Sequence, residues 1–86
     1  MPIRRAVQRD AEAIAKLSDA AAREEGGVSM FDVERIRGNG FGGNALFECW
    51  VAEEGRALTA HAVITKGFDV RRGLPVIVLC ELYVVP

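Results

Sequence analysis

The chain of 86 residues has the length of one small domain, since domains hold roughly 50 to 250 residues. Half of its residues are apolar and 27% are charged, a composition too apolar for a disordered chain. The formal net charge of -1, from 11 basic and 12 acidic residues, gives no electrostatic reason to expect nucleic acid or an anionic membrane as a partner.

The amino-terminal half has the pattern of a short strand followed by two helices. Residues 3–7 are mildly β-prone, and residues 10–25 form the first expected helix, with the Asp10 carboxylate accepting backbone N–H groups at its start. A shorter helix is expected over about residues 30–37, and the glycine-rich residues 38–44 after it predict a loop. The inner faces of the two helices are predicted to carry Ile14, Leu17, Ala20, Ala21, Val33 and Ile36.

The carboxyl-terminal half predicts three strands, over residues 46–53, 57–66 and 76–85. A tight turn joins the first two strands, and residues 69–75 form a second turn rich in Asp, Gly and Arg. The last strand is apolar except for Glu81, which is typical of a strand covered on both faces and central in its sheet. We therefore expect an α+β fold with a mainly antiparallel sheet.

The two cysteines, Cys49 and Cys80, lie in apolar strand-like runs without a Cys-x-x-Cys spacing. We interpret them as buried thiols rather than as a disulfide. The chain opens without the apolar run of a secretory signal, and its longest apolar stretch is far shorter than the roughly 20 residues that span a bilayer. These features predict a cytoplasmic protein without a membrane partner.

Residues 38–43 match the letters of the dinucleotide-binding motif Gly-x-Gly-x-x-Gly. That motif follows a strand and opens a helix, so that the helix N-terminus meets the pyrophosphate. Here the expected helix precedes the glycines and the strand follows them. We therefore interpret this segment as a flexible connection without a nucleotide.

His61 is the single histidine of the chain and lies in the middle of an expected strand. A metal site needs three or four ligands, and Cys49 and Cys80 have no ligand spacing with His61. A structural histidine and no metal site are therefore the favoured interpretation. No nucleophile elbow or base partner accompanies the hydroxyl residues considered, which are Ser18, Ser29 and Thr59.

Glu81 is an isolated carboxylate in an otherwise apolar strand. Such a group is costly to bury unless it is paired or hydrogen-bonded. Two alternatives remain open at this point: Glu81 faces solvent or meets an arginine, or it lines a cleft as a functional carboxylate.

Three segments, taken with the order of the elements, resemble the GNAT superfamily of N-acetyltransferases. Residues 3–17 read I-R-R-A-x-x-x-D-A-x-x-I-x-x-L, which is similar to the opening of many of these enzymes. Residues 51–55, V-A-E-E-G, look like their second strand and turn, and residues 81–86, E-L-Y-V-x-P, look like the end of their fourth strand. The resemblance covers essentially the whole chain.

Within the superfamily, the chain looks most like the diamine (spermidine/spermine) acetyltransferases. Residues 40–42, Gly-Phe-Gly, and the following run over residues 47–53 are similar to a segment of that group. Phe68, Asp69 and Gly73 resemble its turn before the fourth strand. The resemblance thus implies an amine acceptor of small-molecule or polyamine-like type.

The resemblance implies site residues along the last strand. In the superfamily the fourth strand carries a bulge, and backbone groups matching Leu82, Tyr83 and Val84 bind the pantetheine arm of acetyl-CoA. One N–H there stabilises the thioester oxygen in the manner of an oxyanion hole. Glu81 matches the acidic residue before Leu-Tyr-Val and is the candidate base, because an amine protonated at pH 7 must lose a proton before it attacks.

The resemblance also implies residues that contact the acceptor. Glu24 and Glu25 match the region where the diamine enzymes meet their cationic substrate, although a solvated helix end is the alternative. Cys80 stands where those enzymes carry a second, substrate-contacting glutamate. This departure argues against a strictly polyamine-specific site.

The family pattern continues past the position of Pro86 with a loop and helix that hold the pyrophosphate of acetyl-CoA. Residues 1–86 are therefore expected to be a single partial acetyltransferase domain, an amino-terminal half that alone neither binds acetyl-CoA tightly nor transfers acetyl groups. The alternative is a short non-catalytic interaction protein. Both interpretations predict a homo-oligomer that pairs through residues 76–85, because an uncovered apolar strand edge invites another strand.

Overall fold

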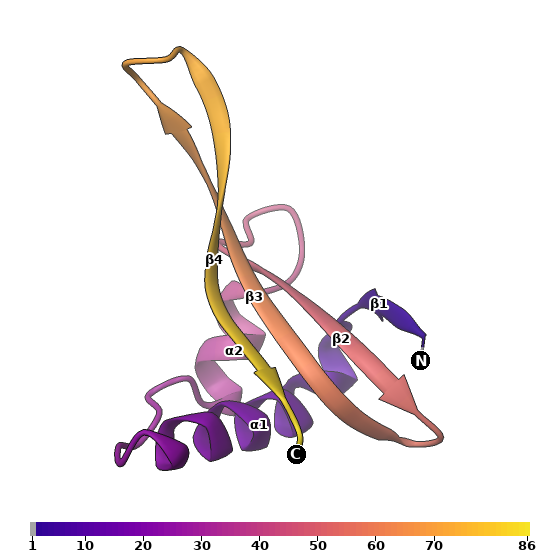
Figure 1. The fold of residues 1–86 in the computed structure, drawn as a ribbon. Helices are drawn as coiled ribbons and strands as arrows, with labels where there is room; N and C mark the ends of the chain where they lie inside the picture. Colours follow the sequence, from indigo (N-terminus) through magenta and orange to yellow (C-terminus); the bar gives the residue numbers. More distant parts are fainter. Residues whose placement is uncertain (1) are drawn as a thin grey trace.

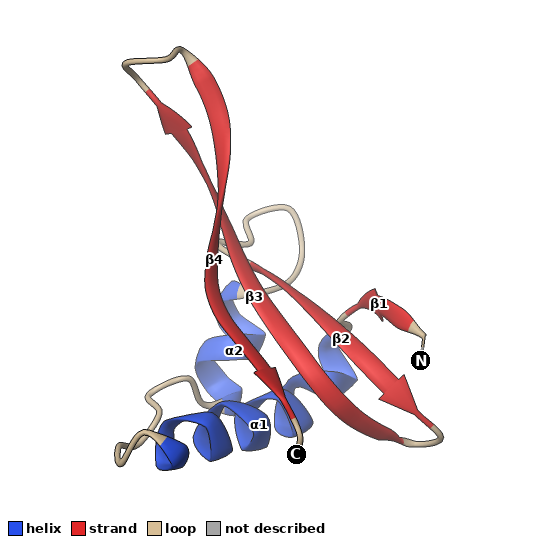
Figure 2. Cartoon of the chain, viewed as in Figure 1, coloured by secondary structure: helices blue, strands red, loops and turns tan. Residues whose placement is uncertain are grey.

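The chain folds into a four-stranded antiparallel sheet with two helices packed on one face (Figure 1). The structure is a computed structural model that describes residues 2–86. The sheet has the order β1-β2-β3-β4, so each strand pairs with its neighbour in the sequence (Figure 2). The elements are β1 (Ile3–Arg5), a 3-10 helix η1 (Gln8–Asp10), α1 (Ala11–Glu24), α2 (Val33–Asn39), β2 (Glu48–Glu54), β3 (Ala57–Asp69) and β4 (Leu74–Val84). The predicted α+β class and the predicted order of elements are confirmed.

The first helix, α1, ends as the paired glycines of the sequence suggest. Gly26 adopts a φ of 81°, and its N–H donates to the carbonyl of Arg23 at 3.0 Å. The N–H of Gly27 donates to the carbonyl of Ala22 at 2.8 Å, which completes a Schellman motif. Within residues 2–86, no helix is long and apolar enough to cross a lipid bilayer.

Asp10 does not cap α1 through its side chain, contrary to the prediction. Its carboxylate instead accepts the N–H of Val7 at 2.7 Å and a paired hydrogen bond from the Arg4 guanidinium at 2.8 and 2.9 Å. The hydrogen bond from Arg4 is the main reason that the pKa of Asp10 lies below its usual value. Arg4 also donates to Glu53 at 3.2 Å, so Arg4 links Asp10, at the start of α1, to β2.

The second helix begins and ends later than predicted, at Val33 and Asn39. Its N-cap is Asp32, whose carboxylate accepts the N–H of Arg35 at 2.9 Å. The prediction of a loop from residue 38 was wrong at its first two positions, since Gly38 and Asn39 are helical. The Asn39 side chain donates to the carbonyl of Arg35 at 2.9 Å and so supports the last turn.

The first two strands are also displaced from their predicted ranges of 3–7 and 46–53. β1 stops at Arg5 because the chain turns into η1, where the N–H of Asp10 donates to the carbonyl of Val7 at 2.9 Å. β2 starts only at Glu48, because Leu46 is held at the end of α2 by a hydrogen bond of 2.7 Å from its N–H to the Asn39 carbonyl.

The hairpin of β3 and β4 extends further than the predicted ranges of 57–66 and 76–85. β3 continues to Asp69 and β4 begins at Leu74, so that only residues 70–73 form the turn. The turn closes through Gly73, which adopts a φ of 68° and donates its N–H to the Asp69 carbonyl at 2.8 Å. The hydrogen bonds of the hairpin thus outweigh the low strand preference of Gly67.

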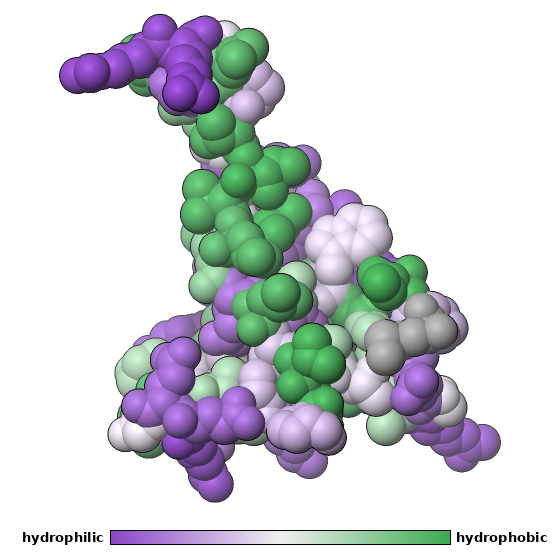
Figure 3. Space-filling model, viewed as in Figure 1, coloured by the Kyte–Doolittle hydropathy of each residue, from purple (hydrophilic) through white to green (hydrophobic). Residues whose placement is uncertain are grey.

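The position of β4 contradicts the prediction of a central strand covered on both faces. β4 pairs with β3 along one edge, and no described strand pairs with its other edge. We call residues 67–79 the arm, because this part of the hairpin projects beyond the helices (Figure 1). Every residue from 74 to 80 is exposed, and the apolar side chains of the arm form a continuous surface (Figure 3). The apolar sequence of β4 therefore does not make it a buried strand.

The described chain buries its core between the helices and the near face of the sheet. Ile14 of α1 and Ile36 of α2 are fully buried, and they pack against Cys49, Val51 and Val63 of the sheet. This confirms the predicted alternation of β2, in which Cys49 and Val51 point inward while Trp50 is exposed. Leu17, Ala20 and Ala21 are only half-buried. Cys49 is buried as predicted, whereas the prediction of a buried thiol at Cys80 was wrong.

Candidate active site at the end of the fourth strand

A β-bulge lies in β4 just before the predicted site residues. Val63 of β3 is opposite Glu81, whereas the next residue, Ile64, is opposite Leu79, so Cys80 is the extra residue. A bulge bends its strand and changes the direction of the side chains around it. The bulge thus separates the arm from the last four residues of β4 and directs Glu81 to the face that the helices cover.

Glu81 has no arginine partner among the described residues, so the arginine alternative is wrong. Its carboxylate Oε1 lies 2.6 Å from Nε2 of His61, and its Oε2 accepts a longer hydrogen bond of 3.4 Å from the Ser18 hydroxyl. The Glu81 side chain is 33% exposed, while the His61 side chain is completely buried. Glu81 therefore stands at the boundary between the core and solvent.

Two serines continue this polar cluster toward the loop between the helices. Ser18 is fully buried on α1, and its Oγ lies 2.8 Å from Oγ of Ser29. Ser29 in turn accepts the N–H of Phe31 at 3.0 Å. The four residues Ser29, Ser18, Glu81 and His61 form one connected hydrogen-bonded group that we call the Glu81 cluster.

The Glu81 cluster shows which part of the sequence interpretation was incomplete. The interpretation of His61 as structural, and of the serines as having no base partner, misses this cluster because the sequence does not show which strand faces α1. A weak signal was present, since Ser18 follows Ile14 by four residues and therefore lies on the buried stripe of α1. His61 similarly shares the inward phase of Val63.

The carboxylate of Glu81 acts electrostatically on a neighbouring thiol. The pKa of Cys49 is raised to about 11, first by burial and then by the negative charge of Glu81. Cys49 is therefore a protonated, unreactive thiol near neutral pH. Tyr83, next to the cluster on β4, tilts its ring against the imidazole of His61 with ring centres 6.5 Å apart.

The main chain beyond the bulge has one edge open. The N–H of Val85 donates to the carbonyl of Thr59 at 2.8 Å, which fixes the hydrogen-bonding phase of β4 against β3. Main-chain groups of an antiparallel strand alternate between its two edges. Tyr83, opposite His61, is therefore directed to β3. Leu82 and Val84 direct their N–H and C=O groups to the open edge.

The predicted acceptor residues lie apart from the Glu81 cluster. Glu24 and Glu25 are exposed at the end of α1, and in residues 2–86 neither makes a side-chain hydrogen bond or ion pair. Cys80 is exposed at the bulge, where its sulfur lies 3.6 Å from the Thr65 hydroxyl. The described residues contain no group of three or more potential metal ligands.

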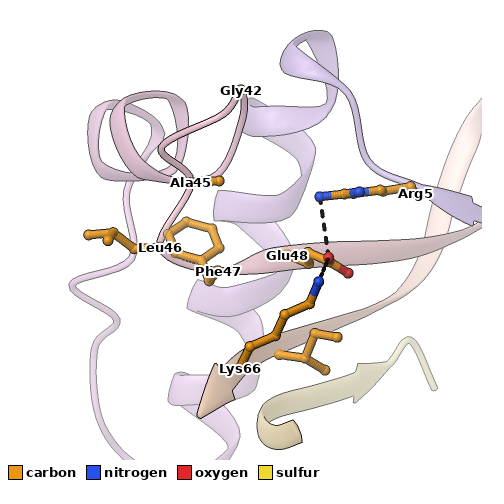
Figure 4. Close-up of a pocket in the computed structure, with 8 residues that line it drawn as sticks. Arg5, Gly42, Ala45, Leu46, Phe47, Glu48 and Lys66 are labelled. Carbon is orange, nitrogen blue, oxygen red and sulfur yellow. Dashed lines mark ion pairs between the residues drawn. The ribbon is translucent and has the colours of Figure 1, made fainter. Parts of the chain in front are cut away.

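A cavity on the far face of the sheet, beside the loop between α2 and β2, does not include Glu81 among its lining residues. It has a volume of about 360 Å³, and three charged residues from three neighbouring strands line it (Figure 4). Glu48 lies 3.4 Å from Arg5 and 3.3 Å from Lys66, and its pKa is lowered by the hydrogen bond from the Trp50 indole and then by Lys66. Both cations are already engaged with Glu48. We interpret this set as two cross-strand ion pairs that share Glu48 on the sheet surface.

Comparisons with known proteins extend the assignment of the fold. No protein-family model matches the chain, and no curated protein matches it. A solved structure does match, that of a possible acetyltransferase from Clostridium difficile 630, with a TM-score of 0.76 and 21% sequence identity. The match covers 98% of this chain and 57% of that one. The described chain thus has the fold of part of that structure and spans a little over half its length.

Proposed function

We propose that this chain supplies the thioester-binding edge and the base of a cytoplasmic N-acetyltransferase that acetylates a small amine. The observation that carries the proposal is the open edge of β4 at Leu82 and Val84, directly beyond the bulge and next to the Glu81 carboxylate. The likeness of the sequence to GNAT enzymes and the shared fold support it. Turnover is proposed to require the further part of the domain that the matched structure has and these residues do not.

The open edge fits the pantetheine arm of acetyl-CoA for a physical reason. Pantetheine is an extended chain with amide groups, and an extended chain adds to a sheet edge through main-chain hydrogen bonds. Leu82 and Val84 each offer one donor and one acceptor on that edge. Acetyl-CoA supplies the activated acetyl group, and an N–H at this edge would stabilise charge that develops on the thioester oxygen.

The amine is proposed to lose its proton to Glu81. An alkyl ammonium has a pKa near 10, so it is mostly protonated at pH 7 and cannot attack until a base removes a proton. Oε2 of Glu81 is the better-placed acceptor, because its hydrogen bond from Ser18 is long, at 3.4 Å, whereas Oε1 lies 2.6 Å from Nε2 of His61. Glu24, Glu25 and Cys80 are proposed as outer contacts for the amine. A polyamine-like acceptor remains part of this proposal.

The binding proposal is tested by amide NMR of the 86-residue chain titrated with S-acetyl-pantetheine. We expect the amide signals of Leu82 and Val84 to shift, whereas the amide of Tyr83, which is directed to β3, shifts less. Adenosine 3′,5′-bisphosphate, the nucleotide part of acetyl-CoA, is the control and should leave these signals unchanged. Unperturbed signals of Leu82 and Val84 at millimolar S-acetyl-pantetheine would refute the proposal.

A matched variant separates the edge from the rest of the fold. Leu82→Pro removes an N–H that faces the open edge, and proline is tolerated on edge strands at such positions. We expect this variant to keep its fold by circular dichroism and to lose the binding of S-acetyl-pantetheine. Acetylation of spermidine by the chain alone, followed by mass spectrometry, should stay at background. Clear turnover would contradict the proposed need for further chain.

A second candidate function is a homo-oligomer formed through β4, in which the chain acts as an interaction module. It is favoured by the exposure of the arm, where Ile77 is 67% and Leu79 is 57% exposed on an unpaired edge. A second copy could extend the sheet antiparallel to the arm, because a strand edge is self-complementary about a two-fold axis. The bulge at Cys80 would leave Leu82 and Val84 outside this interface.

Light scattering after gel filtration tests this second function. We expect a dimer for the unmodified chain and a monomer for Ile77→Lys, because a lysine on an edge strand opposes strand addition. Val28→Lys is the control, since Val28 is also a largely exposed apolar residue and lies outside the arm. Specific dimers are expected to have dissociation constants of about 1 µM or below. An unmodified chain that is still monomeric at about 100 µM would therefore exclude the arm as a stable self-association surface.

A further inference from the structure

The imidazole of His61 is buried between the sheet and α1. The proposed transfer of a proton from the amine to Glu81 does not by itself require a histidine. Its side chain has no exposed area, and its Nε2 lies 2.6 Å from the carboxylate of Glu81. Its other ring nitrogen, Nδ1, is buried and has no hydrogen-bond partner in the described residues. The two nitrogens therefore have opposite environments, which restricts where the ring can carry its proton.

Three protonation states of the His61–Glu81 pair can be compared by what each state places at Nε2 and at Nδ1. An imidazolium places an N–H donor at Nδ1 that is buried without an acceptor. A neutral ring protonated at Nδ1, facing a protonated Glu81, leaves the same orphaned donor. A neutral ring protonated at Nε2 donates to the Glu81 carboxylate and leaves only a lone pair at Nδ1. Because a buried N–H donor without an acceptor carries the full cost of its desolvation, the third state is favoured.

The serines present their hydroxyl groups to the other oxygen of the same carboxylate. Ser29 accepts the N–H of Phe31, so its own hydroxyl proton is free to point to Ser18. Ser18 in turn donates to Oε2 of Glu81. The resulting chain runs in one direction, from a backbone N–H to the carboxylate. Chains of aligned hydrogen bonds polarise one another, so the serines help to hold the orientation of the Glu81 carboxylate.

We propose that His61 is a positioning residue, locked as the neutral imidazole with its proton on Nε2, which holds Oε1 of Glu81 and leaves Oε2 to take the proton of the amine. The proton transfer is balanced: an N–H bond of the ammonium breaks, an O–H bond forms at Oε2, and amine and carboxylic acid both become neutral. His61 keeps its own proton throughout. The positioning role rests on the proposed function, whereas the tautomer does not.

The single histidine of the chain makes the tautomer directly measurable. In the chain labelled with ¹⁵N-histidine, long-range proton–nitrogen correlation NMR distinguishes a protonated ring nitrogen from a bare one. We expect one set of imidazole signals at pH 7, with Nε2 protonated and Nδ1 bare. A proton on Nδ1, alone or together with one on Nε2, would overturn the inference.

Substitutions of Glu81 and of its other partner, Ser18, test what locks the ring. In Glu81→Ala the acceptor is removed and neither nitrogen retains a partner, so we expect both neutral tautomers to be populated. Glu81→Gln keeps an amide oxygen as acceptor and should restore the Nε2-protonated form. Ser18→Ala, which changes the same carboxylate at its other oxygen, is the matched control and should leave the imidazole signals in the Nε2-protonated pattern.

The outcomes separate the inference from the function on which it rests. A Glu81→Ala chain that keeps the single Nε2-protonated form would show that Glu81 does not lock the ring, and a Glu81→Gln chain that loses it would show the same. If Glu81→Ala does not fold, the spectrum of the unmodified chain and the Gln variant still decide. None of these measurements needs acetyl-CoA, whereas failure of S-acetyl-pantetheine to shift Leu82 and Val84 would refute the function and leave the tautomer intact.

Discussion

The half of the sheet beneath the helices and the arm that projects beyond them are built from similar residues but differ in what covers them. Val51 and Val63 are buried because α1 and α2 lie on them, whereas Ile77 and Leu79 are exposed because nothing in the described chain does. Burial of an apolar side chain stabilises a fold by about 25 cal/mol for each Å² removed from water. Apolar side chains therefore stabilise this fold only where a helix packs on them and removes them from water.

The largest expected effect is a loss of stability in the covered half. Ile14→Ala should lower the free energy of unfolding by about 2–5 kcal/mol, because it leaves a cavity in the core. Ile77→Ala, the same change on the arm, should cost less than about 1 kcal/mol. Urea unfolding measures both. Since a domain of this size is marginally stable, Ile14→Val provides a milder variant with an expected loss of about 0.5–1.5 kcal/mol. A large loss for Ile77→Ala would show that the arm is covered in solution.

The reactivity of the two thiols provides a chemical comparison of the same two regions. Cys80 is exposed at the base of the arm, whereas burial and the charge of Glu81 raise the pKa of Cys49 to about 11. Because the thiolate is the reactive form, Cys49 should react with an aromatic disulfide reagent at pH 8 at least about 100 times more slowly than Cys80. Cys80→Ser should remove the fast phase, and urea should make both thiols reactive. Two fast thiols in the folded chain would contradict the burial of Cys49.

Acid should act on the covered half through Asp10. Its pKa is lowered chiefly by Arg4, so its contribution to stability is present above the ordinary carboxyl value of 3.8 and is lost as the pH falls through the lower folded value. Asp10→Asn should therefore cost about 1–3 kcal/mol at pH 7 and progressively less below pH of about 4. Urea unfolding at several pH values measures this difference.

The control for Asp10 is Asp32→Asn. Asparagine also caps a helix, and the exposed pair of Asp32 with Arg35 contributes less than about 1 kcal/mol. The Asp10 variant should therefore lose clearly more stability than the Asp32 variant at pH 7. Equal losses would show that the Arg4–Asp10 contact does not stabilise the start of the chain.

The smallest expected effects come from two glycines at the end of α2. A Cβ on Gly40 would lie 2.6 Å from the Phe47 ring and 2.9 Å from the Ile36 carbonyl, so Gly40→Ala should cost about 1–2 kcal/mol. Gly38 is helical and has open space around its Cα, so Gly38→Ala should instead stabilise the chain by up to about 1 kcal/mol. Thermal unfolding of both variants measures the signs. A stabilising Gly40→Ala would show that Phe47 does not pack closely on the helix end, and a destabilising Gly38→Ala would contradict the expected gain in helix propensity.

The sequence was sufficient for those features that depend on neighbours along the chain. The inward position of Ile14, the alternation of Cys49 and Val51, and the paired glycines after α1 follow from local patterns, and the structure has each of them. The boundaries were less predictable where a local signal competes with a distant contact. Asp10 is an example, because the guanidinium of Arg4 draws its carboxylate away from the helix start.

What the sequence determined by itself was the class of the fold and the order of its elements, because periodicity and turn residues act over a few positions. Only the tertiary structure decided that the apolar last strand lies at an edge of the sheet and that a bulge at Cys80 turns Glu81 toward the helices. Only the tertiary structure, too, brought His61 and Ser18 to the carboxylate of Glu81. These residues are separated by 20 and 63 positions from Glu81, and no local pattern records a contact over such distances. Strand register and the packing of α1 bring them together.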